Sequence, residues 1–254
     1  MAEQQTQAGQ PTTERVRGIF SAIAGRYDTF NKLASLGIDR GWRTALVKAA
    51  ELTPESRVVD LCSGTGDVAL AIAREAAPAY VLATDFTPEM LEVAKEKAAA
   101  YEGPTGLRFE WADAQDLPFD DASFDVATVA FGVRNLPERA RNFAEVLRVL
   151  KPGGRYVILE FSRPPFAPWR AIYHVYLRLI VPTIGGILTG DRAGFVYLND
   201  SIRAFPCQDD LAEELRRAGF EPVRWGNLSG GIVAIHTAVK PDVKPATIGS
   251  TSGD

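Results

Sequence analysis

The sequence predicts an α/β protein with a doubly wound, mostly parallel sheet of seven strands. Short apolar runs alternate with helical patterns over residues 57–160, which is the rhythm of repeated strand–helix–strand units. The first apolar run continues directly into a glycine-rich turn at 62–67. Polar residues recur where successive strands end. Those ends share one edge of a parallel sheet, which is where such folds bind ligands.

The glycine-rich turn starts the series of elements. Gly64 and Gly66 allow a sharp turn and let a ligand approach bare peptide groups. The helix expected after the turn points its free N–H groups at whatever lies there. Cys62, inside the turn, is interpreted as a small thiol that fills space rather than as a nucleophile.

The remaining core elements follow in order. Thr87-Pro88 is typical of a helix N-cap followed by proline in the first turn, and Lys151-Pro152-Gly153-Gly154 ends a later helix. Asn135-x-x-Glu138 fits a capping box. Strands are expected at 57–61, 80–84, 107–111, 124–130 and 155–160, and helices at 68–76, 87–97 and 138–150.

A helical insertion is expected before the last strands, at residues 161–208. Its apolar segment is interrupted by His174 and Arg178, which argues against a membrane span. The insertion is either a packed lid or an apolar channel for a substrate, and composition alone slightly favours packing. A helix at 209–218 and an antiparallel strand pair at 221–225 and 231–239 complete the sheet.

The two chain ends and the segment before the sheet have different compositions. Residues 1–14 and 241–254 are polar and are expected to be a disordered arm and tail. Between them, 15–240 forms one domain. Its first part, 15–50, is helical and somewhat basic, with Phe20, Ile23 and Tyr27 at helical spacing. We expect this segment to be a lid over the ligand, the alternative being a helix that only packs on the sheet.

Composition limits the classes of partner. The 254 residues are 46% hydrophobic, carry a net charge of −4 and have no long basic run, so nucleic acid is not an expected partner. Cys62 and Cys207 are the only cysteines, and no Cys/His cluster has zinc spacing, so we expect neither a disulfide framework nor a metal. The N-terminal residues lack an apolar signal core, which predicts a cytoplasmic protein.

An acidic residue follows the second predicted strand. Asp85 lies nineteen residues after Gly66, an offset at which a carboxylate accepts hydrogen bonds from ribose hydroxyls. Because Gly64-x-Gly66-x-x-Ala69 also fits the dinucleotide fingerprint, a nicotinamide-dependent oxidoreductase is an alternative at this point.

Several motifs together carry a resemblance to a known family. The turn at 59–66, Asp85, Asp113-Ala114 and the Lys-Pro-Gly-Gly stop resemble the class I S-adenosylmethionine-dependent methyltransferases, which have a Rossmann-like fold. The chain is more specifically similar to the ubiquinone/menaquinone C-methyltransferase family. Three stretches carry this similarity: Phe20-x6-Tyr27-Asp28-x2-Asn31, Phe131-Gly132-Val133-Arg134-Asn135, and Gly190-Asp191 with Tyr197-Leu198-x2-Ser201-Ile202-x2-Phe205-Pro206.

The resemblance implies an activity and a cofactor. It implies S-adenosylmethionine-dependent C-methylation of demethylmenaquinol, the last step of menaquinone biosynthesis. The alternative substrate is a prenylated benzoquinol of the ubiquinone pathway or another lipophilic phenol. The implied cofactor-binding residues, with Asp85 at the ribose, Asp113 at the adenine amino group and Ala114 at a ring nitrogen, are Gly64, Thr65, Asp85, Asp113 and Ala114.

Two positions depart from the family pattern. The family often has Ser where this chain has Ala130, so one hydrogen bond to the cofactor is in question. Many members have His where Asp39 stands, which leaves the role of this position open.

The chemistry calls for a group that stabilises charge. A neutral quinol carbon is a weak nucleophile, so a phenolate must develop on the ring oxygen, which requires a base or a cation. Arg134 stays protonated, so we expect it to act as an electrostatic stabiliser, the alternative being a surface salt bridge. Second-rank candidates are Asp191 and Tyr197 for the quinol hydroxyls, and His236 as a base or a sheet histidine.

The expected partners follow from the substrate. They are a prenylated quinol and, transiently, the inner face of the membrane, because the apolar insertion and the basic N-terminal helix suit a bilayer surface. A homodimer is a further expectation, which the sequence leaves open.

Overall fold

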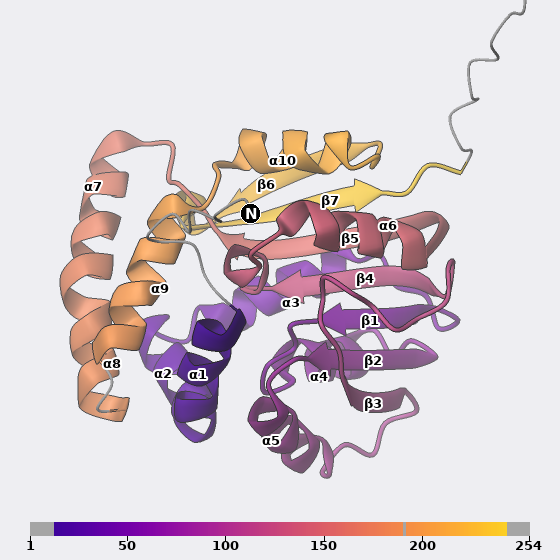
Figure 1. Cartoon of the computed structure of the whole chain (residues 1–254), viewed down its shortest axis with the longest axis horizontal. Coiled ribbons are helices and arrows are strands. Elements are labelled where there is room, and N and C mark those ends of the chain that lie inside the picture. Colours follow the sequence, from indigo (N-terminus) through magenta and orange to yellow (C-terminus); the bar gives the residue numbers. More distant parts are fainter. Residues whose placement is uncertain (1–12, 190–191, 243–254) are drawn as a thin grey trace, which may run out of the picture.

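The sheet matches the predicted fold class. The computed structural model of the chain describes residues 13–189 and 192–242, and within them one seven-stranded sheet has the order β3-β2-β1-β4-β5-β7-β6 (Figure 1). Strands β1 to β5 pair in parallel, and β7 pairs antiparallel with both β5 and β6. The strands are β1 (Arg57–Leu61), β2 (Tyr80–Asp85), β3 (Gly106–Trp111), β4 (Phe124–Ala130), β5 (Leu150–Phe161), β6 (Val223–Leu228) and β7 (Val233–Val239).

Two strands differ from the prediction at their boundaries. β5 begins at Leu150 instead of residue 155, because its pairing with β4 passes through an irregularity in register that absorbs the Pro-Gly-Gly segment. β6 begins at Val223 rather than Glu221, since Pro222 has no backbone N–H to donate to a neighbouring strand. The predicted N-terminal arm, 1–14, is two residues too long, because a helix begins at Thr13. The rest of that arm, 1–12, and residues 243–254 of the predicted tail lie outside the described residues.

Helices cover both faces of the sheet. Alternating side chains of each strand point to opposite faces, as Val58 and Val59 do, so each face receives its own apolar layer. α3 (Asp39–Ala49) and α4 (Asp67–Glu75) pack on one face. α6 (Arg139–Val149) and α10 (Gln208–Arg217) pack on the other, and α5 (Pro88–Ala98) lies against β2 and β3.

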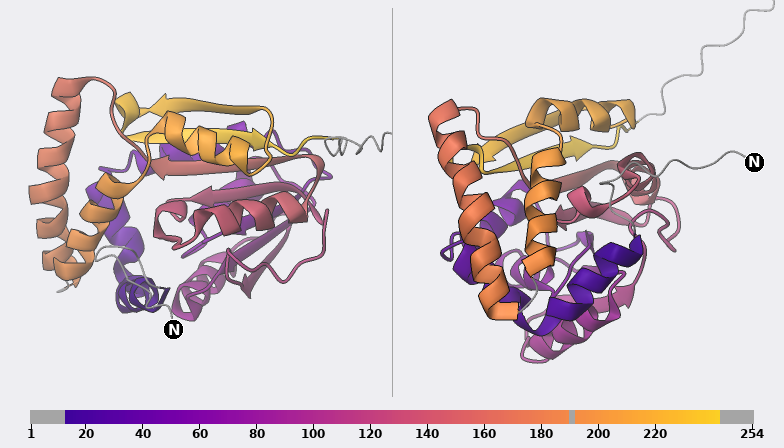
Figure 2. Two further views of the ribbon diagram at one scale, coloured as in Figure 1. Left: turned by 45° about the horizontal axis from the view of Figure 1, so that its top comes forward. Right: turned by 60° about the vertical axis from the view of Figure 1, so that its left-hand side comes forward.

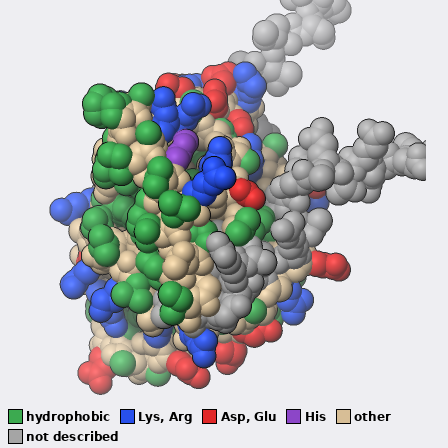
Figure 3. All heavy atoms as spheres, turned by 90° about the vertical axis from the view of Figure 1, so that its left-hand side faces the viewer, with side chains coloured by type: hydrophobic (Ala, Val, Ile, Leu, Met, Phe, Trp, Pro, Cys, Tyr) green, Lys and Arg blue, Asp and Glu red, His purple; other side chains and the backbone are tan. Residues whose placement is uncertain are grey.

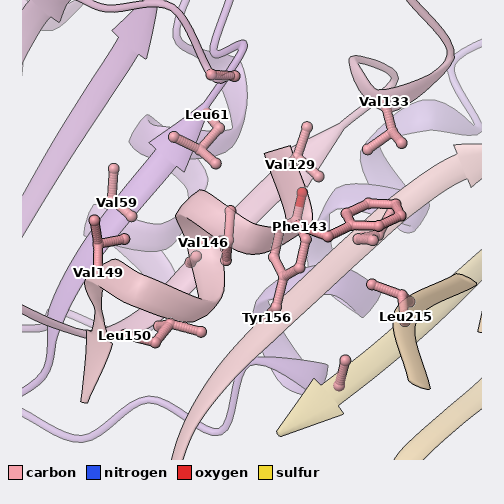
Figure 4. Packing of buried hydrophobic residues seen from close by; sticks show 14 of the residues in the cluster. Val59, Leu61, Val129, Val133, Phe143, Val146, Val149, Leu150, Tyr156 and Leu215 are labelled. Atoms are coloured by element: carbon pink, nitrogen blue, oxygen red, sulfur yellow. The ribbon is translucent and has the colours of Figure 1, made fainter. Parts of the chain in front are cut away.

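The layer under α6 is the larger core. Phe143 and Val146 of α6 point toward strand residues Val129 and Tyr156 (Figure 4). The Tyr156 hydroxyl donates to Asn142 Oδ1 at 2.9 Å, so the one polar group of this ring is satisfied inside the core. The rigid layer fixes the ends of β4 and β5, where site residues lie.

Two helical segments stand beside the carboxyl ends of the parallel strands (Figure 1). The N-terminal segment comprises α1 (Thr13–Ile23), the short helix η1 (Ala24–Arg26) and α2 (Tyr27–Ala34). The insertion between β5 and β6 comprises α7 (Ala167–Val175), the π-helix η3 (Tyr176–Ile180), α8 (Val181–Thr189) and α9 (Arg192–Ala204). α7, η3 and α8 run as one long outer arm with α9 beside it (Figure 2).

The two segments meet in a small apolar cluster. Phe30 of α2 packs with Tyr173, Leu177, Val181 and Ile202 of the insertion. The insertion predicted before the last strands is therefore present, and it is joined to the N-terminal segment across the end of the sheet. Within the described ranges, no helix is both long enough and apolar enough to cross a bilayer.

Candidate active site

The glycine-rich turn connects β1 to α4 in a tightly bonded form. Gly64 and Gly66 adopt φ values of +54° and +79°, in the left-handed region that favours glycine. A Cβ on Gly66 would lie 2.9 Å from the Phe109 ring, so this glycine is needed for packing as well as for the turn. Asp85 Oδ2 accepts from the Gly64 N–H at 2.9 Å, and Asp85 Oδ1 accepts from the Thr87 N–H at 2.8 Å. The carboxylate at the end of β2 therefore holds the turn at the end of β1.

A small cavity lies at this edge of the sheet. Four of the five predicted cofactor residues line it, namely Gly64, Asp85, Asp113 and Ala114. They come from the ends of three adjacent strands, as the doubly wound topology requires. Burial raises the pKa of Asp85, and the N–H groups of Thr87 and Gly64 oppose that rise. Two carboxylates at one strand edge suit the hydroxyl and amino groups of a nucleoside.

Side chains of the N-terminal segment also enter this cavity. Its volume is about 70 Å³, below the roughly 300–1,000 Å³ typical of small-molecule sites. Phe20 and Tyr27, whose rings meet edge to face at 5.8 Å, form part of its wall. These two aromatic rings therefore cover part of the strand edge. Burial is also the main cause that raises the pKa of Tyr27.

Thr65, the fifth predicted cofactor residue, is turned away from this cavity. Its side chain is buried, and its hydroxyl donates to Asp28 Oδ1 of α2 at 2.5 Å. Lys97 Nζ lies 2.7 Å from Asp28 Oδ2 and 3.3 Å from Thr65 Oγ1, and it also contacts Asp67. This charged cluster ties the N-terminal segment to the turn.

Asp39, whose role the sequence left open, belongs to the continuation of that cluster. Arg43 Nη1 lies 3.0 Å from Asp67 Oδ2, and Arg43 Nη2 lies 2.8 Å from Asp39 Oδ2. The Ser35 hydroxyl donates to Asp39 Oδ1 at 2.8 Å. Both carboxylate oxygens of Asp39 therefore have partners. Asp39 holds Arg43 of the same helix, and Arg43 joins α3 to the first turn of α4.

Arg134 lies at the end of β4, in the short helix η2 (Val133–Asn135). Its Nη1 lies 2.9 Å from Glu160 Oε1 and also donates to the Phe131 carbonyl, and its backbone N–H donates to Glu160 Oε2 at 3.2 Å. The guanidinium stacks 5.3 Å from the centre of the Phe161 ring. The surface salt bridge considered for this residue is wrong, because the pair is buried.

A second, much larger cavity begins at Arg134. It has a volume of about 720 Å³ and its walls are almost entirely apolar. The N-terminal segment, the end of β5 and the insertion all line it. The two cavities share a wall formed by Phe20, Tyr27, Phe131 and Asn135. A group bound at the strand edge and an apolar molecule in the large cavity would therefore meet at this wall, next to Arg134.

Sequence reasoning missed two residues of the large cavity and its border. Glu160, the partner of Arg134, appeared only as the last residue of an apolar strand. Tyr173 lies on an apolar helix, and nothing in the sequence marks its hydroxyl as unusual. The side chain is buried and lines the cavity, and its hydroxyl has no hydrogen-bond partner among the described residues. Arg134 Nε is also buried and has no hydrogen-bond partner among the described residues.

The other candidates lie in different surroundings. His236 is a sheet histidine: Nε2 lies 2.9 Å from the Gln208 carbonyl, burial lowers its pKa, and it lines neither cavity. Tyr197 lines the large cavity and donates to Asn135 Oδ1 at 3.3 Å. Asp191 lies outside the described residues. Ala130 lines the small cavity with its methyl group.

The predicted capping box is wrong. The N-cap of α6 is Glu138, and no side chain caps this helix. The Glu138 N–H donates to Gln115 Oε1 at 2.8 Å, while the Asn135 amide lies 3.4 Å from the Phe131 carbonyl. Tertiary contacts replace the local pattern, and Asn135 is left beside the two cavities.

Comparison with solved structures defines the class of the fold. A SAM-dependent methyltransferase from Thermotoga maritima superposes with a TM-score of 0.60 at 21% identity, covering 88% of this chain and 98% of that one. Phosphoethanolamine N-methyltransferase 2 of Haemonchus contortus, in complex with S-adenosyl-L-methionine, gives 0.59 at 16% identity, over 90% and 58%. The fold is that of the class I methyltransferases.

The sequence places the chain within that class. Residues 8–240 match the ubiE/COQ5 methyltransferase family, and the chain belongs to this family. It is 42% identical over 228 residues to the ubiquinone/menaquinone biosynthesis C-methyltransferase UbiE of Geobacter sp. (strain M21), covering 89% of this chain and 97% of the relative. It is 43% identical over 227 residues to the demethylmenaquinone methyltransferase of Clavibacter sepedonicus, over 89% and 91%. The predicted methyltransferase is confirmed, and the oxidoreductase alternative is set aside.

Proposed function

We propose that this enzyme transfers the methyl group of S-adenosylmethionine to a ring carbon of demethylmenaquinol, yielding menaquinol. The observation that carries the proposal is the pair of cavities with a shared wall. One has two carboxylates at a strand edge, and the other is large, apolar and bordered by a buried arginine. Relatives named for menaquinone and ubiquinone biosynthesis support this substrate class.

The residues of the strand edge fit a nucleoside donor. Asp85 would accept from the ribose hydroxyls, Asp113 from the adenine amino group, and the Ala114 N–H would face a ring nitrogen. Bound S-adenosylmethionine supplies a methyl group that its sulfonium already activates. For Thr65 to reach the donor, its hydroxyl must leave Asp28, so its predicted role depends on movement of the N-terminal segment. Phe20 and Tyr27 would then close over the site and exclude water.

The large cavity fits the lipid substrate. Its apolar walls suit a prenyl chain, and the ring would lie at the shared wall near Arg134. When the ring hydroxyl gives its proton to solvent water, the fixed guanidinium would stabilise the phenolate, which makes the ring carbon a better nucleophile. The ring carbon then takes the methyl group and loses its own hydrogen as a proton to water, while the phenolate regains a proton. Arg134 Nε and the Tyr173 hydroxyl, two donors without partners among the described residues, suit the ring oxygens. Arg134 is thus the proposed catalytic residue, and Tyr173 a substrate-binding one.

A direct assay tests the proposal. The purified protein is incubated with S-adenosylmethionine carrying a labelled methyl group and with reduced demethylmenaquinone or a prenylated demethyl-benzoquinol, and the product ring is identified by mass spectrometry. We expect label on a ring carbon of the naphthoquinol, with Arg134→Met strongly impaired. Label only on the benzoquinol assigns the alternative substrate, and label on neither ring contradicts the proposal.

The lipid substrate also bears on where the enzyme works. Its prenyl chain keeps it in the bilayer, so we extend the proposal to transient contact with the inner face of the membrane. The expected homodimer stays a prediction, which light scattering on the purified protein decides.

A further inference from the structure

The outer arm of the insertion leaves a row of large apolar side chains exposed. Their exposed fractions range from 45% to 80%. Hydrophobic side chains gather over this side of the molecule, with basic side chains among them (Figure 3). The row, called here the α7–α8 face, comprises Ile172, Val175, Leu179, Ile180 and Ile187.

The arm is apolar on its inner side as well. Tyr173, Leu177 and Val181 are buried and line the large cavity, while Val175 and Leu179 between them point outward. A surface helix in water normally turns a polar stripe outward. The arm is therefore apolar on both sides, and no other described part of the chain covers its outer side. Such a surface is suited to contact with a lipid phase.

The charge on the arm has one sign. No acidic residue occurs between Glu160 and Asp191, although the chain as a whole carries a net charge of −4. Arg163 and Arg178 are exposed. Arg163, Arg170 and Arg178, like Arg203 of α9, form no ion pair with a carboxylate of the described residues. A basic and apolar surface on an acidic protein is complementary to an anionic lipid surface.

The large cavity opens beside this face. Phe166 and Ile172, at the start of the arm, line the cavity and are also more than half exposed. Leu36 and Ile38, in the loop after α2, also line the cavity and are more than half exposed. The cavity therefore reaches the surface at exposed apolar residues, and one of them, Ile172, belongs to the α7–α8 face.

We propose that the α7–α8 face is a docking surface for an anionic bilayer, which holds the cavity mouth against the lipid so that the substrate enters without crossing water. The nature of the cavity's occupant rests on the proposed function. A second copy of the chain is a poorer occupant, because a two-fold contact places the same patch opposite itself. The arginines of the two copies would then face one another without carboxylates from the arm.

Vesicle flotation of the full chain tests the proposal without any assay of activity. The probe is vesicles of phosphatidylcholine, with and without phosphatidylglycerol. We expect flotation that requires phosphatidylglycerol. Each basic side chain at an anionic surface contributes about fivefold to partitioning, so Arg163→Glu/Arg178→Glu should lower the partition coefficient at least about 25-fold. Leu179→Asn/Ile187→Asn, which changes no charge, should lower it at least about tenfold.

A charge-matched variant and an independent readout make the outcome decisive. Arg108→Glu/Arg224→Glu alters the same number of charges on β3 and β6, and it should float like the wild type. Leu179 and Ile187 do not line the cavity, so their variant should methylate a short-chain quinol in detergent at the wild-type rate. Flotation without methylation would support the docking surface and reject the proposed function. The docking surface would be overturned if the protein did not float, or if all variants floated equally. It would also be overturned if the protein formed a dimer instead of binding vesicles, and Leu179→Asn/Ile187→Asn dissociated that dimer.

Discussion

Arg134 and Glu160 form an ion pair whose side chains are 4% and 1% exposed, 2.9 Å apart at the ends of β4 and β5. Glu160 receives both the guanidinium and the backbone N–H of Arg134. A buried pair of this kind is weak support for stability, because desolvation of both groups offsets their attraction. Its value lies in orientation: the carboxylate fixes one edge of the guanidinium and leaves Nε without a partner among the described residues.

Glu160→Gln should therefore reduce catalysis more than donor binding. The amide keeps the shape but removes the charge that orients Arg134. We expect kcat to fall about tenfold or more, since small misplacements of a catalytic group carry such costs. The affinity for S-adenosylmethionine should stay unchanged. Steady-state kinetics and calorimetry measure the two quantities separately.

The matched control is Glu145→Gln. Glu145 Oε2 lies 2.8 Å from Arg148 Nη2, and this pair lines neither cavity. This variant should leave kcat near the wild-type value. Glu160→Asp, which restores the charge, should recover part of the rate. Equal losses in the variants at positions 145 and 160 would show that Glu160 acts only on the fold.

Tyr173→Phe tests the hydroxyl that has no partner among the described residues. Without substrate the change removes a buried polar group that makes no hydrogen bond there, so the melting temperature should stay equal or rise. With a quinol substrate, the lost hydrogen bond should weaken binding and raise KM by the equivalent of about 0.5–1.5 kcal/mol of free energy. Tyr176→Phe, at a tyrosine whose hydroxyl donates to the Ala34 carbonyl, is the comparison and should lower the melting temperature. An unchanged KM in Tyr173→Phe would remove Tyr173 from the substrate site.

The sequence predicts some residues of the site and misses others. Asp85 and Asp113 could be placed at the strand edge because local periodicity locates strand ends, and parallel topology brings those ends together. Glu160 is 26 residues from Arg134, and no local pattern joins them. The prediction for Asn135 failed in the opposite way. A convincing local capping pattern, Asn135-x-x-Glu138, yielded to a tertiary contact in which the Glu138 N–H donates to Gln115 Oε1.

Asp85→Ala should weaken binding of S-adenosylmethionine by about 1.5–3 kcal/mol, the range for hydrogen bonds to a charged group. The carboxylate would hold the ribose, and it also accepts from the N–H groups of Gly64 and Thr87. Isothermal titration calorimetry gives the loss directly. Asp125→Ala is the control, since Asp125 accepts from the Arg57 N–H at 2.8 Å but lines neither cavity. Unchanged affinity in Asp85→Ala would refute the assignment.

Lys97→Met should loosen the N-terminal segment from the glycine-rich turn. Lys97 is the cation that contacts Asp28 of that segment and Asp67 of α4. Since these groups are partly exposed, we expect a loss of about 1 kcal/mol at most. Amide exchange across residues 20–34 should quicken, and S-adenosylmethionine should dissociate faster. Lys95→Met, which removes an exposed pair with Glu92 on the same helix, should change neither rate.

Asp60 gives the stability of the fold a definite dependence on pH. Burial raises the pKa of this carboxyl to about 7, although the Thr128 hydroxyl, which donates to it at 2.6 Å, and the Ala69 backbone oppose the rise. In the unfolded chain an aspartate has a pKa of about 3.9, so between these values the folded state binds the additional proton. The contribution of Asp60 to stability is thus fully present below about pH 4 and is lost as pH rises through about 7.

In Asp60→Asn the side chain stays uncharged at every pH, so the variant lacks this dependence of stability on pH. The melting temperature of the wild type relative to that of the variant should therefore decrease from pH 5 to pH 8, as measured by differential scanning fluorimetry in buffers of equal ionic strength. Asp120→Asn, at an exposed carboxylate, should show no such trend. Because contributions of all other groups cancel in the comparison, a difference that stays constant across this range would mean that Asp60 is already ionised at pH 5 in the folded protein. Its burial among the central strands would then be offset by interactions stronger than the Thr128 hydroxyl provides.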